Sequence, residues 1–200
     1  MPYRESIFAP NNYFHIFCRG NEKRDIFLDY TDYEHFLSRM EKYKIIHKIS
    51  IICYCLMPNH FHLLLRQNAD ETISSFIHRL TVSHSMYFNK RYNRTGHLFQ
   101  GSFKAKLVSK NEYLLHLSRY IHLNPLKIMN SISGLETYPW SSYPEYIKGD
   151  RDIKEEICEK EIILQQFNNS DPRQSYKRFV NVSTLDTEFI KIKNIIIEPE

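Results

Sequence analysis

Two adjacent apolar segments, separated by only two residues, constrain the fold of this chain more than any other feature. They are residues 49–57 (ISIICYCLM) and residues 60–67 (HFHLLLRQ), with Pro58-Asn59 between them. Apolar segments of this length and composition favour strands, and proline followed by asparagine favours a short turn. The pattern therefore predicts a β-hairpin.

Segments before and after this hairpin complete an alternating pattern of strands and helices. Two of them place apolar residues at helical spacing next to residues that favour helix termini. The predicted elements, in chain order, are a strand at 13–19, a helix at 31–47 capped by Thr31 or Asp32, the two strands of the hairpin, a helix at 71–93, a strand at 102–108 and a helix through Tyr113, Leu117 and Tyr120 towards Pro125.

This order of elements predicts the fold class. Strand, helix, strand, strand, helix, strand is the split βαββαβ arrangement of the ferredoxin-like fold, an α+β class with an antiparallel sheet and helices on one face. The last helix, which carries Tyr120, is an addition to that unit.

The pattern weakens in the last third of the chain. We expect one domain over residues 1–137 and an appendage of unknown role over residues 138–200. Within the appendage, residues 140–143 (WSSY) are expected to pack back on the domain, and residues 150–167 to form a helix. Residues 168–200 look polar and irregular until the apolar residues 195–197.

Length and composition place the chain among globular proteins of the cytoplasm. It has 200 residues, of which 42% are hydrophobic, which is enough for a core. A membrane span needs about 20 consecutive apolar residues, and no such run occurs, nor does the N-terminus resemble a signal peptide. The four cysteines are expected to be reduced and buried rather than paired.

Positive charge is concentrated in one part of the chain, although the net charge is only +4. From Ser75 to Lys110 the sequence contains basic residues and no aspartate or glutamate, a pattern that indicates contact with a phosphate backbone or, alternatively, a solvated basic face. The candidates for DNA binding in this stretch are Arg79, Lys90, Arg91, Arg94, Lys104 and Lys106.

Two histidines open the second strand of the hairpin. Because side chains alternate along a strand, His60 and His62 should lie on one face and Phe61 on the other. Such a pair can hold a divalent metal ion, or can be two half-buried histidines with separate hydrogen-bond partners. Cys53 and Cys55 on the preceding strand would add thiol ligands for zinc, but their apolar surroundings favour core thiols instead.

The last predicted helix places polar residues beside an apolar stripe. His116, Tyr120 and Asn124 follow one another at intervals of four residues, so a phenol and an amide project together from the edge of a buried face. The chain has 14 tyrosines, and spacing alone does not distinguish a reactive tyrosine from one that only packs.

Four segments together resemble a known family. They are residues 13–21 (YFHIFCRGN), 57–64 (MPNHFHLL), 94–104 (RTGHLFQGSFK) and 119–125 (RYIHLNP). In this order they are similar to the motifs of the single-tyrosine HUH transposases, and most similar to the branch of REP-associated tyrosine transposases. The resemblance extends from about Tyr13 to Ile132.

The resemblance implies a site and an activity. The histidine–hydrophobic–histidine motif falls on His60 and His62, which would bind Mg²⁺ or Mn²⁺, and Asn124 would complete the metal site. The tyrosine that precedes Ile-x-x-Asn-Pro is Tyr120, the implied catalytic nucleophile. The implied substrate is single-stranded DNA next to a hairpin, cleaved through a 5′-phosphotyrosine intermediate, and Arg19 joins the DNA-binding candidates.

Two other functions remain compatible with the sequence. One is a nucleic-acid-binding module that uses the same sheet without chemistry, and the other is a zinc-dependent hydrolase built on the two histidines and the cysteines. The sequence allows a homodimer and does not exclude a monomer.

Overall fold

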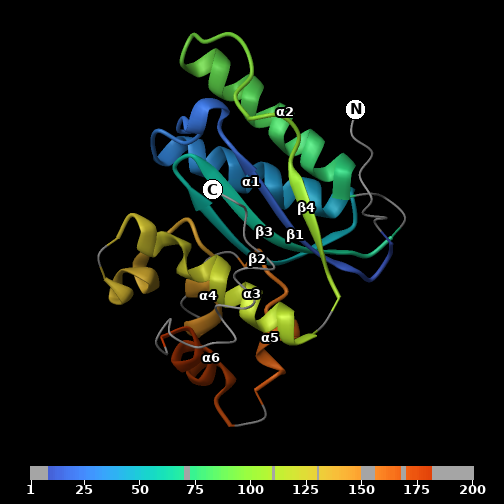
Figure 1. Ribbon diagram of the computed structural model, residues 1–200, viewed down its shortest axis with the longest axis vertical. Helices are drawn as coiled ribbons and strands as arrows, with labels where there is room; N and C mark the ends of the chain where they lie inside the picture. Colours follow the sequence, from blue (N-terminus) through green and yellow to red (C-terminus); the bar gives the residue numbers. More distant parts are fainter. Residues whose placement is uncertain are drawn as a thin grey trace.

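A four-stranded antiparallel sheet forms the centre of the computed structural model (Figure 1), which describes residues 9–69, 73–109, 111–129, 131–149, 156–167 and 170–181. Its strands are β1 (Tyr13–Arg19), β2 (Ile49–Met57), β3 (His60–Gln67) and β4 (Lys104–Val108), in the spatial order β2-β3-β1-β4. The first three have the predicted limits, and β4 begins at Lys104 rather than Ser102.

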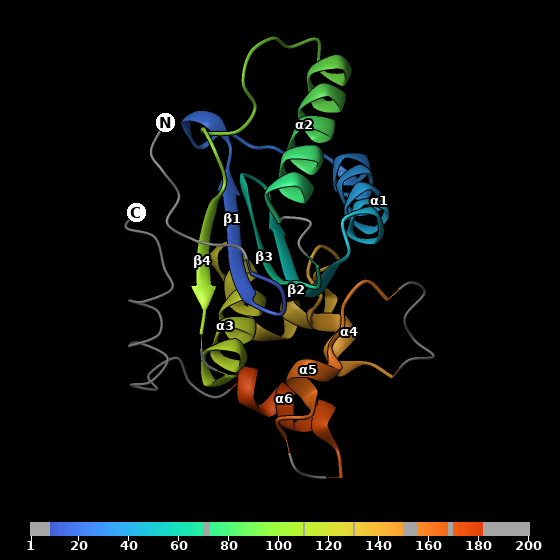
Figure 2. The ribbon, with the colours of Figure 1, turned by 90° about the vertical axis from the view of Figure 1, so that its right-hand side faces the viewer.

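Two helices cover one face of this sheet, as Figure 2 shows from the side. They are α1 (Tyr30–Ile46) and α2 (Ile73–Arg91). From β3, Phe61, Leu63 and Leu65 point towards them and are fully buried, as the two-residue period of a strand requires. Phe36 of α1 lies with its ring centroid 5.1 Å from that of Phe61. The element order and the sheet order confirm the predicted ferredoxin-like fold.

The start of α1 differs from the sequence prediction in one detail. The residue that caps the helix is Asp29, whose side chain accepts hydrogen bonds from the backbone N–H groups of Thr31 and Asp32. Thr31 and Asp32 therefore lie inside the first turn. The side chain of Asp32 is instead fully buried and accepts a hydrogen bond from the backbone N–H of Leu28 at 2.8 Å.

The opposite face of the sheet carries α3 (Asn111–Leu123), the added helix. Leu117 and Ile121 of this helix are fully buried. The α-helix ends at Leu123, and a 3₁₀ turn, η2 (Asn124–Lys127), follows with Pro125 in its first positions. A proline disfavours α-helical geometry at the residue before it, which is Asn124 in this chain. The helix therefore stops one residue before Asn124.

Residues after 137 pack against the edge of β2. The backbone carbonyl of Trp140 accepts from the N–H of Leu56 at 2.8 Å, and the N–H of Ser142 donates to the carbonyl of Tyr54 at 3.1 Å. These bonds confirm that residues 140–143 pack back on the sheet. The described elements that follow η2 are η3 (Ile132–Thr137), α4 (Tyr143–Ile147), α5 (Glu161–Leu164) and α6 (Pro172–Asn181).

The predicted helix over residues 150–167 is wrong for residues 156–160 and right for the short helix α5 (Glu161–Leu164). Residues 156–160 are not helical, and α5 spans only four residues. The buried carboxylate of Glu145 accepts hydrogen bonds from the N–H groups of Ile157 and Cys158, and the N–H of Glu159 donates to the carbonyl of Ile51 on β2. Tertiary hydrogen bonds thus override a helical pattern. Residues 150–155 lie outside the described part.

The prediction of irregular structure from residue 168 onwards is also wrong over α6. Asp171 accepts a hydrogen bond from the N–H of Gln174 at 3.0 Å, and Pro172 begins the helix, as both residue types favour. Tyr176 of this helix is fully buried, and its hydroxyl lies 2.7 Å from Nδ1 of His122 on α3. Residues 195–197 lie outside the described residues.

Among the helices of the described residues, none is long and apolar enough to cross a membrane.

Candidate active site

Three histidines meet on the face of the sheet that α3 covers. On β3, His60 and His62 lie opposite Arg19 and Phe17 of β1, and residues directly opposite each other share a face. The ring centroids of His60 and His62 are 5.0 Å apart. The structure thus places both histidines on one face, as their spacing predicts. His15 of β1 lies on the same face, two residues from Phe17.

A direct contact joins two of these rings. Nε2 of His15 lies 3.0 Å from Nδ1 of His62, and the two rings are nearly parallel with centroids 5.2 Å apart. Sequence reasoning gave His15 no role, although residue 15 lies within a motif of the resemblance. The period of two along β1 puts His15 on the face of Phe17 and Arg19, but its contact with His62 depends on β1 and β3 being neighbours.

The turn before β3 fixes the first histidine. Nδ1 of His60 lies 2.6 Å from Oδ1 of Asn59, and the carbonyl of Asn59 accepts from the N–H of Gly20 at 2.8 Å. A Cβ atom on Gly20 would lie 2.1 Å from the carbonyl oxygen of Arg24, so only glycine fits there. The Pro58-Asn59 turn is therefore anchored to the end of β1.

Tyr120 of α3 lies over the histidines. Its ring centroid is 5.6 Å from that of His62 and 6.2 Å from that of His15, with both contacts close to perpendicular. The side chain is 8% exposed. Helical spacing explains the placement, because Leu117 and Ile121 anchor the helix in the core and turn Tyr120 towards the sheet.

Asn124 follows Tyr120 at the next turn and is almost fully buried. Its Nδ2 donates to the carbonyl of Tyr120 at 2.9 Å. Within the described part of the chain, Oδ1 of Asn124 is buried without a hydrogen-bond partner. A buried oxygen of this kind is costly unless something else binds it.

Burial keeps His62 neutral. The pKa of His62 is well below the usual value for histidine, mainly because burial disfavours the charged form, and further because His15, His60 and Lys127 lie nearby. A neutral imidazole keeps a lone pair for a metal ion at neutral pH.

These residues fit a divalent cation better than a thiolate-bound zinc ion. Two imidazoles suit Mn²⁺, Fe²⁺ or Zn²⁺ at least as readily as Mg²⁺, and an amide oxygen that lacks a partner among the described residues suits Mn²⁺ or Mg²⁺. In the part of the chain that the structure describes, no group of three or more His, Cys, Asp or Glu residues is arranged around one metal position. Cys53 and Cys55 are fully buried, and burial raises the pKa of both thiols, which disfavours the thiolate form that zinc requires.

Basic residues on the same face surround the site. Lys104 and Lys106 of β4 lie opposite Phe17 and His15, and Arg19 lies opposite His60. The structure brings these three DNA-binding candidates to the histidine face.

A further lysine was missed by sequence reasoning. Nζ of Lys127 lies 5.8 Å from the ring centroid of Tyr120. Lys127 lies in η2, and its position beside Tyr120 results from the 3₁₀ turn that follows α3. A continued α-helix would have placed it elsewhere.

The other basic candidates belong to the opposite face. Arg79 and Lys90 are exposed on α2, and the guanidinium of Arg79 stacks on the ring of Tyr43 at 5.3 Å. Arg94 follows α2 and stacks on Phe88 at 5.7 Å.

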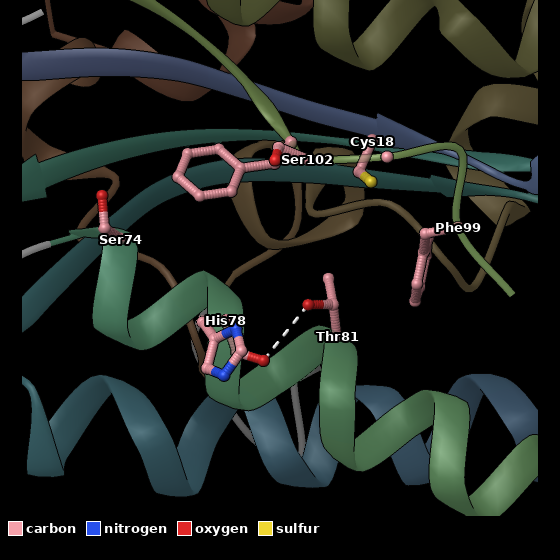
Figure 3. Close-up of a pocket in the computed structure, with 8 residues that line it drawn as sticks. Cys18, Ser74, His78, Thr81, Phe99 and Ser102 are labelled. Atoms are coloured by element: carbon pink, nitrogen blue, oxygen red, sulfur yellow. Dashed lines mark hydrogen bonds between the residues drawn. The ribbon is translucent and has the colours of Figure 1, made fainter. Parts of the chain in front are cut away.

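A cavity of about 350 Å³ lies on that side as well, between α2 and residues 99–103 (Figure 3). Its lining includes Cys18, His78 and Phe99. Cys18 is the strand partner of Phe61, so the cavity opens on the face of the sheet that α1 and α2 cover. It is separate from His62 and Tyr120.

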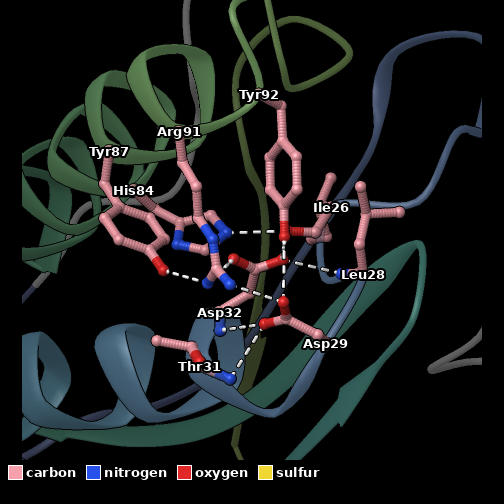
Figure 4. Close-up of polar contacts among 9 residues, drawn as sticks. All are labelled: Ile26, Leu28, Asp29, Thr31, Asp32, His84, Tyr87, Arg91 and Tyr92. Carbon is pink, nitrogen blue, oxygen red and sulfur yellow. Dashed lines mark hydrogen bonds and ion pairs between the residues drawn. The ribbon is translucent and has the colours of Figure 1, made fainter.

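Arg91, also on α2, is held by two carboxylates (Figure 4). Its guanidinium lies 2.5 Å from Oδ2 of Asp29 and 3.1 Å from Oδ1 of Asp32. The hydroxyl of Tyr92 donates to Asp32 at 2.9 Å. The stretch from Ser75 to Lys110 lacks acidic residues in sequence, but Asp29, which caps α1, and Asp32, in its first turn, balance Arg91 in space.

The sheet order and the helix added to it agree with the fold that the resemblance to single-tyrosine HUH transposases implies. The model of the family described as "Transposase IS200 like" matches residues 9–124, more than half of the 200 residues. The chain therefore belongs to the IS200-like transposase family.

One solved structure supports the fold. A REP-associated tyrosine transposase bound to a REP hairpin has a TM-score of 0.61 and 15% sequence identity, over 80% of this chain and 94% of that one. A candidate transposase from Deinococcus radiodurans R1 matches with a TM-score of 0.42 and 14% identity, over 60% of this chain and 95% of that one. No curated protein matches the chain.

Proposed function

We propose that this transposase cleaves and rejoins single-stranded DNA next to a hairpin, with Tyr120 as the nucleophile and a divalent metal ion held by His60, His62 and Asn124. One observation carries the proposal: the ring of Tyr120 lies 5.6 Å from that of His62, on the sheet face that also holds His60. A nucleophile and a metal-binding pair beside each other are what attack on a phosphodiester requires.

The tyrosine must lose its proton to react. The unperturbed pKa of a tyrosine is about 10, so its hydroxyl is mostly protonated at neutral pH. In the proposed step Tyr120 Oη forms a bond to phosphorus while the bond from phosphorus to the 3′ oxygen breaks. The phenol proton leaves Oη, and the 3′ oxygen gains a proton as it departs. The products are a 5′-phosphotyrosine and a free 3′-hydroxyl.

The metal-binding residues would act before and during this step. When bound, the ion would supply positive charge to a non-bridging oxygen of the scissile phosphate. His60 and His62 would hold it through neutral imidazoles, and the buried Oδ1 of Asn124 would gain the partner that it lacks among the described residues. Because Asn124 also donates to the carbonyl of Tyr120, one side chain would couple the metal site to the tyrosine helix.

Basic side chains on the same face would bind the substrate. Arg19, Lys104 and Lys106 lie beside the histidines, and Lys127 lies beside Tyr120, so the phosphates of a single strand could run along β4 to the tyrosine. The hairpin part of the proposal is supported by the solved structure of similar fold, which is bound to a REP hairpin. The covalent intermediate conserves the energy of the broken bond, so rejoining needs no nucleotide cofactor.

Other tyrosines are placed less well for the reaction. Tyr87 and Tyr92 lie on or just after α2, on the other face of the sheet, and their hydroxyls bond to Arg91 and Asp32. Both have a raised pKa, with burial as the first cause, which further disfavours the nucleophilic phenolate. Tyr113 shares α3 with Tyr120 and is the best matched control.

Adduct mapping tests the proposal. A DNA hairpin with single-stranded flanks, labelled on the strand downstream of the cut, is incubated with the protein and Mn²⁺. We expect a covalent adduct that maps to Tyr120, persists in Tyr113→Phe and vanishes in Tyr120→Phe, while Tyr120→Phe still folds and binds the hairpin. An adduct on Tyr113, or one that survives in Tyr120→Phe, would refute the assignment. Hairpin binding without any adduct would instead indicate a non-catalytic module.

A further inference from the structure

His15 is a buried polar side chain beside the site to which the reaction above assigns no role. It lies on β1, diagonal to His62 across the strand pair, with 1% of its surface exposed against 5% for His62. Nε2 of His15 and Nδ1 of His62 are 3.0 Å apart, within hydrogen-bond distance. His62 lies between two neighbours on the adjacent strands. The ring centroid of Phe17 on β1 is 6.0 Å from that of His62, and Cys55 is the partner of His62 on β2.

This contact decides which nitrogen of His62 can bind a metal ion. A neutral imidazole carries its proton on one ring nitrogen and a lone pair on the other. Since Nδ1 of His62 faces His15, a metal ion can reach this ring without displacing His15 only at Nε2. The lone pair is at Nε2 only when the proton is on Nδ1, where it can be donated to Nε2 of His15. The reverse direction of the hydrogen bond would place a proton on Nε2 of His62 and exclude the metal.

We infer that His15 is a positioning residue: it accepts a hydrogen bond from Nδ1 of His62 and so holds His62 in the tautomer and orientation that bind the metal ion. The inference rests on the proposed function, because it takes His62 as a metal ligand. Outer hydrogen-bond partners of this kind fix the ring and raise the basicity of metal-binding histidines, and their loss typically lowers metal affinity by about 10–100-fold.

Two substitutions of His15 separate the hydrogen bond from packing. His15→Gln can place an amide oxygen near the position of Nε2 and still accept the bond, whereas His15→Leu fills similar space without an acceptor. Phe17→Leu is the matched control, because it alters the packing around His62 and leaves the hydrogen bond. Each full-length variant is titrated with Mn²⁺, in the absence of DNA, by electron paramagnetic resonance of the free ion. Circular dichroism checks the fold.

We expect Mn²⁺ to bind His15→Leu about 10–100-fold more weakly than the unmodified protein, and His15→Gln and Phe17→Leu to stay within a few-fold. Nitrogen-15 spectra of the histidine rings in the unmodified protein give a second readout that needs no variant. With Mg²⁺ bound, His62 should carry its proton on Nδ1. Unchanged Mn²⁺ affinity in a folded His15→Leu, or a proton on Nε2 of His62 in the metal-bound protein, would overturn the inference.

One more variant keeps the two proposals distinct. If His62→Ala abolishes Mn²⁺ binding while His15→Leu does not, the role of His15 is wrong and the proposed metal site stands. If His62→Ala leaves Mn²⁺ binding unchanged, the metal site itself is wrong, and with it the role of His15. If His15→Leu fails to fold, His15→Gln and the ring spectra of the unmodified protein decide the question.

Discussion

At the scale of single residues, the histidine face of the sheet brings the proposed catalytic groups together with basic side chains. His62 is buried and neutral, since its pKa is well below the usual value, and the cationic groups lie at the rim on β4 and η2. Lys104 lies across from Phe17, and Lys106 across from His15. This arrangement leaves His62, a proposed metal ligand, uncharged, while the basic side chains around it would attract phosphates.

The two lysines of β4 should therefore dominate the salt dependence of DNA binding. In Lys104→Gln/Lys106→Gln, the affinity for a hairpin with single-stranded flanks should fall. The slope of log affinity against log salt should become shallower by about 0.7 for each lost phosphate contact on a single strand. Fluorescence anisotropy between low and moderate salt measures both quantities.

Lys90→Gln is the control for this experiment, because Lys90 is exposed on α2, on the other side of the sheet. It should change the affinity and the slope little. An equal loss of DNA affinity in Lys90→Gln would mean that DNA also contacts the face covered by α1 and α2. The DNA-binding surface would then be larger than the histidine face.

The sequence was sufficient for some site residues and insufficient for others, for a physical reason. The two-residue period of a strand is local, so it predicts that His60 and His62 share a face. The contact between His15 and His62 joins residues 47 positions apart and depends on the strand order. The placement of Lys127 depends on a 3₁₀ turn in place of a further turn of α-helix.

At the scale of elements, contacts between helices and strands explain where prediction succeeded and failed. The strands and the helices of the sheet unit follow from hydrophobic periodicity, because each has a buried side that repeats regularly. Residues 156–160 have no such constraint. Their conformation is fixed by Glu145 and by the edge of β2. Local sequence patterns do not contain those partners.

Arg91 was predicted to bind DNA because of the basic stretch around it, but in the structure it joins two helices. Its guanidinium ties the end of α2 to the start of α1 through Asp29 and Asp32. Arg91→Met should lower the free energy of unfolding, because the fully buried carboxylate of Asp32 loses a charged partner. Chemical denaturation measures the change.

The neighbouring substitution Lys90→Met provides the comparison, since it removes an equal charge from an exposed position. Its effect on stability should be close to zero, within about 0.5 kcal/mol. If Arg91→Met leaves stability unchanged and weakens hairpin binding, Arg91 contacts DNA as its sequence context suggests, and the clamp between the helices is unimportant.

At the scale of the whole molecule, the sheet separates two packed layers, and each layer buries a histidine. His84 of α2 lies in the layer with α1, where its Nε2 is 2.8 Å from the carbonyl oxygen of Ile26. His122 of α3 lies in the other layer, between the hydroxyls of Tyr176 and Ser142. Burial lowers the pKa of His84 to about 4 and that of His122 to about 3.

These shifts predict how the stability of the whole protein depends on pH. In the unfolded chain a histidine has a pKa of about 6.5. As the pH falls below that value, the unfolded state binds protons that the folded state excludes, and the free energy of unfolding decreases. The decrease continues to about pH 4 for His84 and to about pH 3 for His122. Between pH 7.5 and 5.5, His84 and His122 should each lower the free energy of unfolding by about 1.4 kcal/mol.

Urea denaturation at pH 7.5, 6.5 and 5.5, with EDTA present to remove metal ions, measures this dependence. The amide of His122→Gln can still bond to Tyr176 or Ser142. Between pH 7.5 and 5.5, the free energy of unfolding of this variant should fall by about 1.4 kcal/mol less than that of the unmodified protein, even if the variant is less stable at every pH. His78→Gln, at an exposed position of α2, should keep the full decrease. An unchanged pH dependence in His122→Gln would show that His122 takes up a proton in the folded protein. The charged form of His122 would then be tolerated between α3 and α6, although the side chain is fully buried there.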